Sequence, residues 1–281
     1  MGFLKGINFV PNYNLIPYRL KWLLIFGISM NKSVNWGLAL SGGGARGIIH
    51  IGVLQAFEEM GFKPVCVAGT SMGAIVGALY ASGMKPARMM ELISDRGFLR
   101  MFSLKASFSG LLEMSYLKKV LQEHLPETFE ELDMPFSAAA TNLSRHELVV
   151  FNSGTLHQAV IASASIPVLF APVLIGDEAY IDGGVIDNLP ASACKEHCDK
   201  ILGVEVNFGN FTPDLKNMKN VAIEVFYIML NNNSLHGIHD CDSLIRPELN
   251  SEFQLLDFSK SEKLFEIGRH EGMKWLKQNY R

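Results

Sequence analysis

Short apolar runs alternate along the chain with longer segments in which apolar residues recur at helical spacing. The short runs predict buried strands, at residues 36–40, 65–68, 136–140, 148–151, 179–181 and 201–206. The periodic segments predict helices at residues 46–59, 72–81, 116–124, 155–164, 191–198, 220–230 and 261–278. Such alternation favours an α/β fold, a three-layer sandwich in which helices cover both faces of a mostly parallel central sheet.

Residues 31–281 contain no internal repeat, low-complexity linker or break in composition, so we expect them to form one domain. We interpret residues 1–30 as an N-terminal extension. This extension is either poorly ordered, in contact with a membrane surface, or upstream of the true translation start. Its longest apolar run, residues 22–30, is about half of the ~20 residues needed to cross a bilayer, so no transmembrane helix is expected.

Composition argues for a folded protein and against nucleic-acid binding. Hydrophobic residues make up 48% of the 281 and charged residues 19%, which excludes a disordered or polyelectrolyte chain. The net charge of -3 gives no general attraction to nucleic acid. Residues 1–57 contain no Asp or Glu, but they do contain Lys5, Arg19, Lys21, Lys32 and Arg46. Only this front end could be drawn to an anionic surface, so we expect at most peripheral contact with a membrane. We expect the protein to be cytoplasmic.

The cysteines are too few and too scattered for a disulfide scaffold, and they are typical of reduced thiols in an intracellular protein. Two sets of side chains could be imagined as metal ligands: Cys194, His197 and Cys198, and His236, His239 and Cys241. Neither set has a CxxC pair or a known zinc spacing, so we expect no metal and no other cofactor.

The strongest candidate for chemistry is the GxSxG sequence at residues 69–73, which follows a short predicted strand and precedes a helix of small residues. That context is the one that a nucleophile elbow requires. Gly69 and Gly73 remove Cβ atoms where a sharp turn brings backbone segments together. Ser71 would then lie at the tip of the turn, near a helix N-terminus whose dipole favours an oxyanion.

A second glycine-rich turn, residues 42–47, separates the first predicted strand from the first predicted helix. Its spacing also fits the GxGxxG dinucleotide fingerprint, which requires an acidic residue at the end of the second strand. That strand ends in Gly69-Thr70-Ser71, so the dinucleotide hypothesis fails, and no Gly-Lys-Ser/Thr follows to make a P-loop. We therefore predict an oxyanion hole. Its residues are Gly42, Gly43, Gly44 and Ala45, with Gly43 and Gly44 as the principal donors and Arg46 and Gly47 as support. Arg46 would steady the loop or attract an anionic head group.

A third motif, Asp182-Gly183-Gly184, follows the strand predicted at residues 179–181. Taken alone, it is more typical of an Asx turn than of a catalytic acid. A hydrolase serine needs a base, but none of the eight histidines lies in a context that indicates catalysis. His50, His157 and His270 fall in predicted helices and are interpreted as surface or capping residues.

Residues 84–117 combine methionines and phenylalanines with arginines, and glycines and serines interrupt their helical pattern. Flexible thioethers and aromatic rings suit a surface that fits varied apolar ligands. An acyl-binding cap and an ordinary core beneath a loop both remain open for this segment.

The three motifs together, with the block Ala162-Ser163-Ala164-Ser165-Ile166-Pro167 between them, resemble the patatin-like phospholipases over residues 36–207. The resemblance implies a patatin-like fold for the predicted domain, with a Ser–Asp dyad in place of a triad. Ser71 would be the nucleophile and Asp182 its partner, supported by Gly69, Gly73, Gly183 and Gly184. It also implies hydrolysis of phospholipid or lysophospholipid esters through an acyl-enzyme, without a cofactor. The alternatives are an esterase or thioesterase for small substrates, and a non-catalytic lipid-binding or regulatory module.

Overall fold

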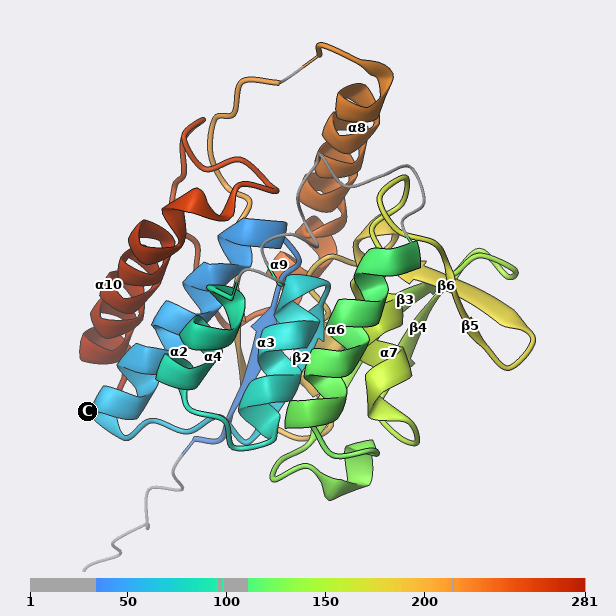
Figure 1. Cartoon of the computed structure of the whole chain (residues 1–281). Coiled ribbons are helices and arrows are strands. Elements are labelled where there is room, and N and C mark those ends of the chain that lie inside the picture. Colours follow the sequence, from blue (N-terminus) through green and yellow to red (C-terminus); the bar gives the residue numbers. More distant parts are fainter. Residues whose placement is uncertain (1–33, 96–97, 99–110, 214, 281) are drawn as a thin grey trace, which may run out of the picture. The chain divides into compact units, whose positions relative to one another are not determined.

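A computed structural model describes residues 34–95, 98, 111–213 and 215–280, apart from the side chains of residues 111–113. The chain divides into two units, Met1–Val34 and Asn35–Arg281, and the fold described below is that of the second unit (Figure 1). The predicted N-terminal extension, residues 1–30, lies outside the described residues. Within the described ranges, every helix is either too short or too polar to cross a membrane.

The second unit is built on one mixed, mostly parallel sheet. Its strands are β1 (Trp36–Leu40), β2 (Cys66–Thr70), β3 (Phe136–Asn142), β4 (Glu147–Phe151), β5 (Val173–Ile175), β6 (Glu178–Asp182), β7 (Lys200–Val204) and β8 (Ser243–Ile245). They are ordered β5-β6-β3-β2-β1-β7-β8, with β4 also paired to β3. The pairs joining β3, β2, β1, β7 and β8 are parallel, whereas β4, β5 and β6 pair antiparallel. The expected α/β class is therefore confirmed.

The helices among the described residues are α2 (Ile48–Met60), α3 (Met72–Ala81), α4 (Pro86–Ile93), α6 (Leu111–His124), α7 (Leu156–Ser163), α8 (Met218–Asn233), α9 (Leu235–Asp240) and α10 (Ser261–Asn279). They lie between the strands along the chain, with two runs of consecutive helices, α3 to α6 and α8 to α9, and α10 follows the last strand. Short 3₁₀ turns connect them: η2 (Gly44–Gly47), η3 (Phe129–Glu131), η4 (Gly183–Val185), η5 (Ala191–Cys194) and η6 (Phe258–Lys260).

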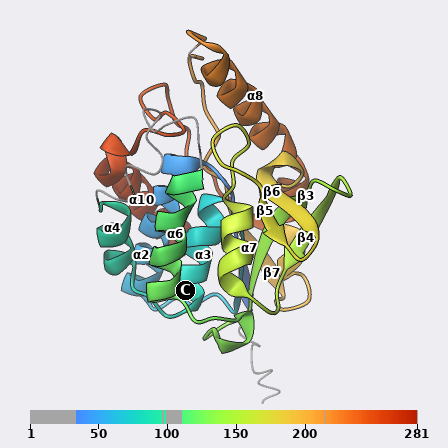
Figure 2. The ribbon, with the colours of Figure 1, turned by 45° about the vertical axis from the view of Figure 1, so that its right-hand side comes forward.

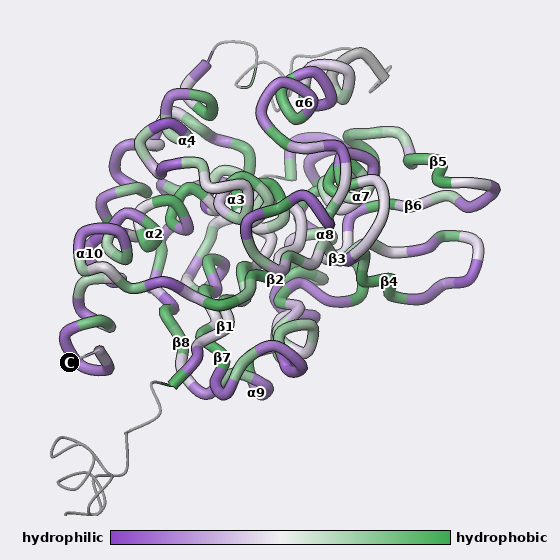
Figure 3. Tube along the Cα trace, turned by 90° about the horizontal axis from the view of Figure 1, so that it is seen from below, coloured by the Kyte–Doolittle hydropathy of each residue, from purple (hydrophilic) through white to green (hydrophobic). Residues whose placement is uncertain are grey.

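Alternate residues of the central strands face two different cores. On β1, Leu38 and Leu40 join the larger core and Ala39 the smaller one, because successive side chains of a strand point to opposite faces. Helices α2, α3, α4, α6, α7 and α10 cover the larger core, and η5 and α9 cover the smaller one. Figures 1 and 2 show the first set of helices together on one side of the strands. In Figure 3, the tube at β7 and β8 is largely green, whereas the outer turns of α10 are largely purple.

Helices α2 and α10 cross at unusually close range because each contributes a glycine to the contact. A Cβ added at Gly268 would lie 2.0 Å from the carbonyl oxygen of Ile49, and one added at Gly52 would lie 2.0 Å from that of Phe265. These contacts tie the C-terminal helix to the helix that follows the glycine-rich turn.

Several elements differ from those expected from the sequence. The helix predicted at residues 191–198 is only the 3₁₀ turn η5, in which the Ser192 carbonyl accepts a hydrogen bond from the Lys195 amide three residues on. Strands β5 and β8 and helices α4 and α9 were not predicted. Helix α2 begins at Ile48, because residues 44–47 form the turn η2 rather than helix.

Residues 84–117 are described in part. Met89 and Ile93 of α4, together with Phe98, are buried in the larger core, and Met84, Met90 and Met114 pack against it. This described part forms ordinary core. The remainder of the predicted acyl-binding cap, residues 96–97 and 99–110, lies outside the described residues.

Candidate active site

Ser71 lies alone between the end of β2 and the start of α3. Its backbone has φ 56° and ψ -123°, a conformation that L-residues adopt rarely and at a cost in strain. The side chain is 5% exposed. Its own amide donates to Ser163 Oγ at 3.0 Å, so α7 helps to hold the turn. This is the geometry of a nucleophile elbow.

The two glycines that flank Ser71 are required by close backbone contacts. A Cβ on Gly69 would lie 2.3 Å from the carbonyl oxygen of Gly73, and a Cβ on Gly73 would lie 2.3 Å from that of Leu40. Any side chain at either position would force β2, α3 and β1 apart. The turn therefore depends on both glycines of the motif.

Strand β3 brings Asp182 next to Ser71 although 110 positions separate them in the sequence. Thr70 pairs with Ala139 on one side of β3, and Asp182 pairs with Ala140 on the other. A Cβ on Gly183 would lie 2.3 Å from the Ala139 carbonyl oxygen, so the turn after Asp182 also packs directly on β3. Strands β2 and β6 therefore both end beside neighbouring residues of β3, which brings the two predicted dyad residues together across that strand.

Burial changes the acidity of Asp182. The side chain is fully buried, and this raises its pKa from 3.8 to about 7, although the Ser71 side chain and the Gly184 amide both lower it. Oδ1 accepts a hydrogen bond from the Gly184 amide at 2.9 Å. Oδ2 has no hydrogen-bond partner among the described residues. Near neutral pH this carboxyl can both gain and lose a proton beside Ser71.

The family block between the motifs supports both residues. Ser163 Oγ accepts from the Ser71 amide at 3.0 Å, and the Ser165 carbonyl accepts from the Asp182 amide at 3.0 Å. Both serines are fully buried. The sequence contained this block, but its pattern alone did not predict that it contacts the two sides of the site.

The glycine-rich turn adjoins Ser71: a Cβ on Gly42 would lie 3.0 Å from the Cβ of Ser71. The amide of Gly42 donates to the Asn188 carbonyl at 3.0 Å, and that of Ala45 donates to the Leu255 carbonyl at 2.8 Å. Within the described residues, the amides of Gly43 and Gly44 have no such partner. Of the four predicted oxyanion donors, the amides of Gly42 and Ala45 are thus already engaged, and those of Gly43 and Gly44 stay candidates.

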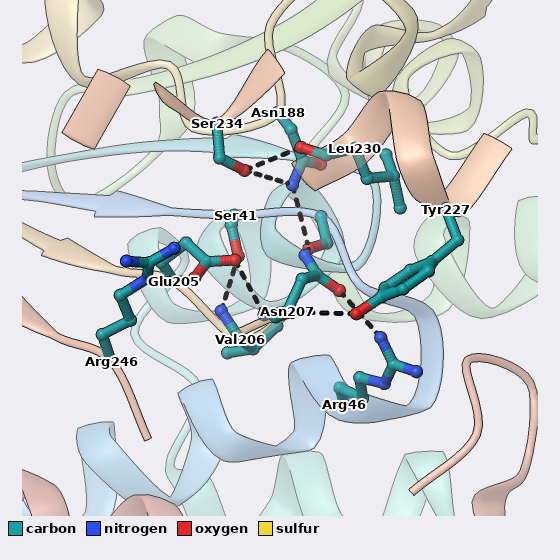
Figure 4. A network of polar contacts seen from close by, with 11 residues as sticks. Ser41, Arg46, Asn188, Glu205, Val206, Asn207, Tyr227, Leu230, Ser234 and Arg246 are labelled. Carbon is teal, nitrogen blue, oxygen red and sulfur yellow. Dashed lines mark hydrogen bonds and ion pairs between the residues drawn. The ribbon is translucent and has the colours of Figure 1, made fainter. Parts of the chain in front are cut away.

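A polar network holds the glycine-rich turn in place (Figure 4). The Asn207 side-chain amide donates to the Gly42 carbonyl at 2.7 Å, and the Val206 amide donates to Ser41 Oγ at 3.2 Å. Asn188, from the segment after η4, donates from Nδ2 to Ser234 Oγ at 2.9 Å. The turn is thus held by the segment that follows β7 and, through Asn188, is linked to Ser234 at the end of α8.

Arg46 is a buried anchor of this turn, only 2% exposed. Its guanidinium lies 3.7 Å from the ring centre of Phe211 and 4.5 Å from that of Tyr227. Nε donates to the Phe253 carbonyl at 2.8 Å, and burial lowers the pKa of the group. Of the two roles considered for Arg46, this geometry matches steadying of the loop rather than attraction of a head group.

His50 is not a surface or capping residue, and that interpretation was wrong. Its side chain is fully buried beneath the glycine-rich turn, where Nε2 donates to the Ser41 carbonyl at 2.8 Å. Burial lowers the pKa of His50 to about 4, so the ring is neutral at physiological pH. Neighbouring Gly47 is also closely packed, since a Cβ there would lie 2.3 Å from Met72 Cγ.

Three of the cysteines meet on the sheet face opposite the large helices. A Cβ on Gly37 would lie within 3.0 Å of Cys66 Sγ, Cys198 Sγ and the Cys194 Cβ. The described residues nevertheless contain no group of three or more His, Cys, Asp or Glu side chains arranged to hold a metal ion. Neither candidate set of ligands, Cys194 with His197 and Cys198 or His236 with His239 and Cys241, forms such a group among these residues.

The fold and this site together define an α/β protein with a serine at a strand–helix elbow, and comparison with known proteins identifies the family. Residues 38–195 match the patatin-like phospholipases, so the chain belongs to the patatin-like phospholipase family. VipD from Legionella pneumophila has a similar fold, with a TM-score of 0.60 at 17% identity, covering 87% of this chain and 67% of that protein.

Relatives by sequence include NTE family proteins. An uncharacterized NTE family protein of Mycobacterium tuberculosis is 34% identical over 198 residues, which cover 69% of this chain and 55% of the relative. The lysophospholipase NTE1 of Saccharomyces cerevisiae is 26% identical over 273 residues, or 83% of this chain and 16% of the relative. The chain thus spans about half the length of the mycobacterial relative and a smaller part of the yeast one.

Proposed function

We propose that the protein is a serine lipid acyl hydrolase that cleaves carboxylic ester bonds of phospholipids or lysophospholipids. The observation that carries this proposal is the juxtaposition of Ser71, in a strained elbow, with a buried Asp182 whose pKa is raised to about 7. The amides of Gly43 and Gly44, adjacent in the chain to Gly42, would serve as the oxyanion donors.

In the proposed cycle, Ser71 Oγ attacks the ester carbonyl carbon while Asp182 Oδ2 accepts the hydroxyl proton. The amides of Gly43 and Gly44 stabilise the tetrahedral oxyanion. The C–O bond to the leaving alcohol breaks as Asp182 returns the proton to that alcohol, leaving an acyl-Ser71 ester. A water molecule, deprotonated by Asp182, then attacks the acyl carbon. The bond between the acyl carbon and Ser71 Oγ breaks, Asp182 returns the proton to Ser71 Oγ, and the fatty acid is released.

The relatives support a lipid substrate rather than a small ester. The family is named for phospholipases, and the yeast relative is a lysophospholipase. An ordinary carboxylate is too weak a base to deprotonate a serine readily. The burial of Asp182 raises its pKa and so makes it a stronger base. The intact elbow, and the Gly43 and Gly44 amides that make no hydrogen bond within the described part of the chain, argue against a binding module that has lost catalysis.

Labelling with a fluorophosphonate probe tests whether Ser71 is a nucleophile. We expect the wild-type protein to be labelled and Ser71→Ala to lose labelling completely. Ser82→Ala is the matched control, because Ser82 caps the other end of α3 through a bond from Oγ to the Leu79 carbonyl at 2.8 Å. A wild-type protein that resists the probe, or a Ser71→Ala variant that still reacts, would contradict the assignment.

Chain-length preference separates the lipid hydrolase from the small esterase. We expect turnover of long-chain lysophosphatidylcholine to exceed that of butyrate esters, with Ser71→Ala inactive towards both. Faster turnover of the butyrate ester, with no effect of liposomes, would instead favour the esterase alternative.

A further inference from the structure

Helix α8 is apolar on a face that no other described element covers. Its sixteen residues include only two charged ones, Lys219 and Glu224, and only Phe226 and Leu230 are buried. Met218 is 83% exposed, Val225 51% and Ile228 57%. With Val221, these residues recur at a spacing of three and four, so they share one face of the helix. We call Met218, Val221, Val225 and Ile228 the apolar face of α8.

The opposite face of α8 contacts the turn that carries Asp182. Asn233 Nδ2 donates to the Val185 carbonyl at 2.7 Å and to the Gly184 carbonyl at 3.1 Å. A Cβ on Gly184 would lie 2.2 Å from Leu230 Cδ2, so the helix is seated directly on η4. The position of Asp182 is therefore linked to the position of α8.

The same helix contacts the glycine-rich turn. Tyr227 donates its hydroxyl proton to the Asn207 carbonyl at 2.9 Å, and its ring lies over the Arg46 guanidinium. Figure 4 shows Tyr227 and Leu230 extending from one helix towards the network around Ser41 and Asn207. Helix α8 thus contacts both the turn after Asp182 and the glycine-rich turn. In Figures 1 and 2 its first turns project beyond the strand ends.

A lipid surface is the occupant that fits this face. The four residues of the apolar face are uncharged, as expected for contact with acyl chains. Lys219, next to the first of them, provides a cation for anionic head groups at the projecting end of the helix, whereas Glu224 borders the face further along. Leu215, 62% exposed, precedes the helix and extends the apolar strip. Because the opposite side of α8 contacts the site, a bilayer along this face would lie about one helix diameter, roughly 10 Å, from the turns that carry the site.

We propose that the apolar face of α8 docks on the surface of a lipid bilayer and positions the Ser71 site against its lipid substrate. This inference rests on the proposed lipid hydrolase function, since it names the surface from which the substrate is taken. It assigns membrane contact to a helix late in the chain, rather than to the basic residues at the front.

Tryptophan fluorescence tests the docking independently of turnover. The full chain carrying Ser71→Ala is compared with the same chain carrying also Val225→Trp or Met60→Trp, in phosphatidylcholine–phosphatidylglycerol vesicles with brominated acyl chains. Met60 is the matched control because it is apolar, 40% exposed, and ends α2 about 20 Å from the glycine-rich turn. After subtraction of the parent spectrum, we expect the tryptophan at position 225 to be blue-shifted and quenched, and the one at position 60 to be neither.

Absence of quenching at position 225, or equal quenching at both positions, would overturn the proposal. Any vesicle binding by another part of the chain contributes equally to the two variants. Gel filtration gives a further outcome: a wild-type dimer that Val225→Asp converts to monomer, without quenching at position 225, would show that a second copy covers the face and the docking proposal is wrong.

A kinetic ratio provides a second measurement. For Val225→Asp/Ile228→Asp we expect the ratio of vesicle phospholipid turnover to soluble butyrate ester turnover to fall at least about tenfold, because two apolar contacts with lipid are lost. Met60→Asp should keep the wild-type ratio. An unchanged ratio in the double variant contradicts docking while leaving the hydrolase function intact. A wild-type protein that hydrolyses no ester refutes that function, and the fluorescence experiment still decides the docking.

Discussion

Replacing Asp182 by Asn should make the protein more stable at alkaline pH while abolishing turnover. The wild-type carboxyl is fully buried, and its Oδ2 lacks a hydrogen bond among the described residues. Its ionised form is therefore destabilised in the folded protein but not in the unfolded chain. Asn has nearly the same shape and cannot ionise, so the variant avoids this penalty.

The pKa of Asp182 sets the size and direction of the effect. The folded value of about 7 lies above the ordinary 3.8, so the stability that protonation contributes is complete below pH 3.8 and is lost as the pH rises through about 7. A tenfold change in proton affinity is worth about 1.4 kcal/mol, which makes the total loss about 4 kcal/mol. About 3 kcal/mol of this falls between pH 5 and pH 8.

Urea unfolding of wild type and Asp182→Asn, at pH 5 and pH 8, measures this directly. The free energy of unfolding of the variant, minus that of wild type, should rise by about 3 kcal/mol between the two pH values. Taking the difference cancels the other titrating groups, which both proteins share. Asp177→Asn, at an exposed turn residue, controls for the loss of a carboxylate. Its free energy of unfolding relative to wild type should differ by less than about 0.5 kcal/mol between the two pH values. A pH-independent difference for Asp182→Asn would refute the raised pKa.

Two further predictions concern the rate and the packing. The kcat/KM for a soluble ester should rise with pH through about 7, because Asp182 must be ionised to accept the Ser71 proton; a profile that is flat from pH 5 to 9 would contradict its role as base. Gly268→Ala should lower the free energy of unfolding by about 2–4 kcal/mol in urea, since its Cβ would lie 2.0 Å from the Ile49 carbonyl oxygen. Gly272→Ala, whose Cβ would lie 2.9 Å from that of Ala56, should lower the free energy of unfolding by less. If both variants lower it equally, α2 and α10 move apart to accommodate the added methyl group, and the close contact at Gly268 does not limit stability.

The sequence was informative where a local pattern determines the structure. An apolar run stopped by glycines predicted β1 and β2, and small residues after Ser71 predicted α3. Strands β5 and β8 have three residues each, too few to show a period, and their existence depends on the partner strand. The helical pattern of residues 191–198, directly after Pro190, suggested a helix, but the chain there completes only a 3₁₀ turn over β1 and β7.

The sequence could not predict contacts that join distant segments. Arg46 was recognised as part of the loop motif, yet its partners Phe211, Tyr227 and Phe253 lie more than 160 positions later. The engagement of the Gly42 amide by Asn188 likewise depends on the folded path of the chain. Motif spacing therefore identified four candidate oxyanion donors, Gly42 to Ala45. Hydrogen bonds to the distant residues Asn188 and Leu255 then left the amides of Gly43 and Gly44 as the candidates.

The buried histidine beside the site bears on the choice of base. His50 is the only histidine within the described residues that is fully buried, and its Nε2 proton is held by the Ser41 carbonyl. Burial disfavours the charged form of every group, so it lowers the pKa of an imidazole and raises that of a carboxyl. Here the two values are about 4 for His50 and about 7 for Asp182, which inverts their ordinary order of basicity. In this buried setting the carboxylate is the stronger base of the two. The Ser–Asp pair that we propose would therefore need no histidine near neutral pH.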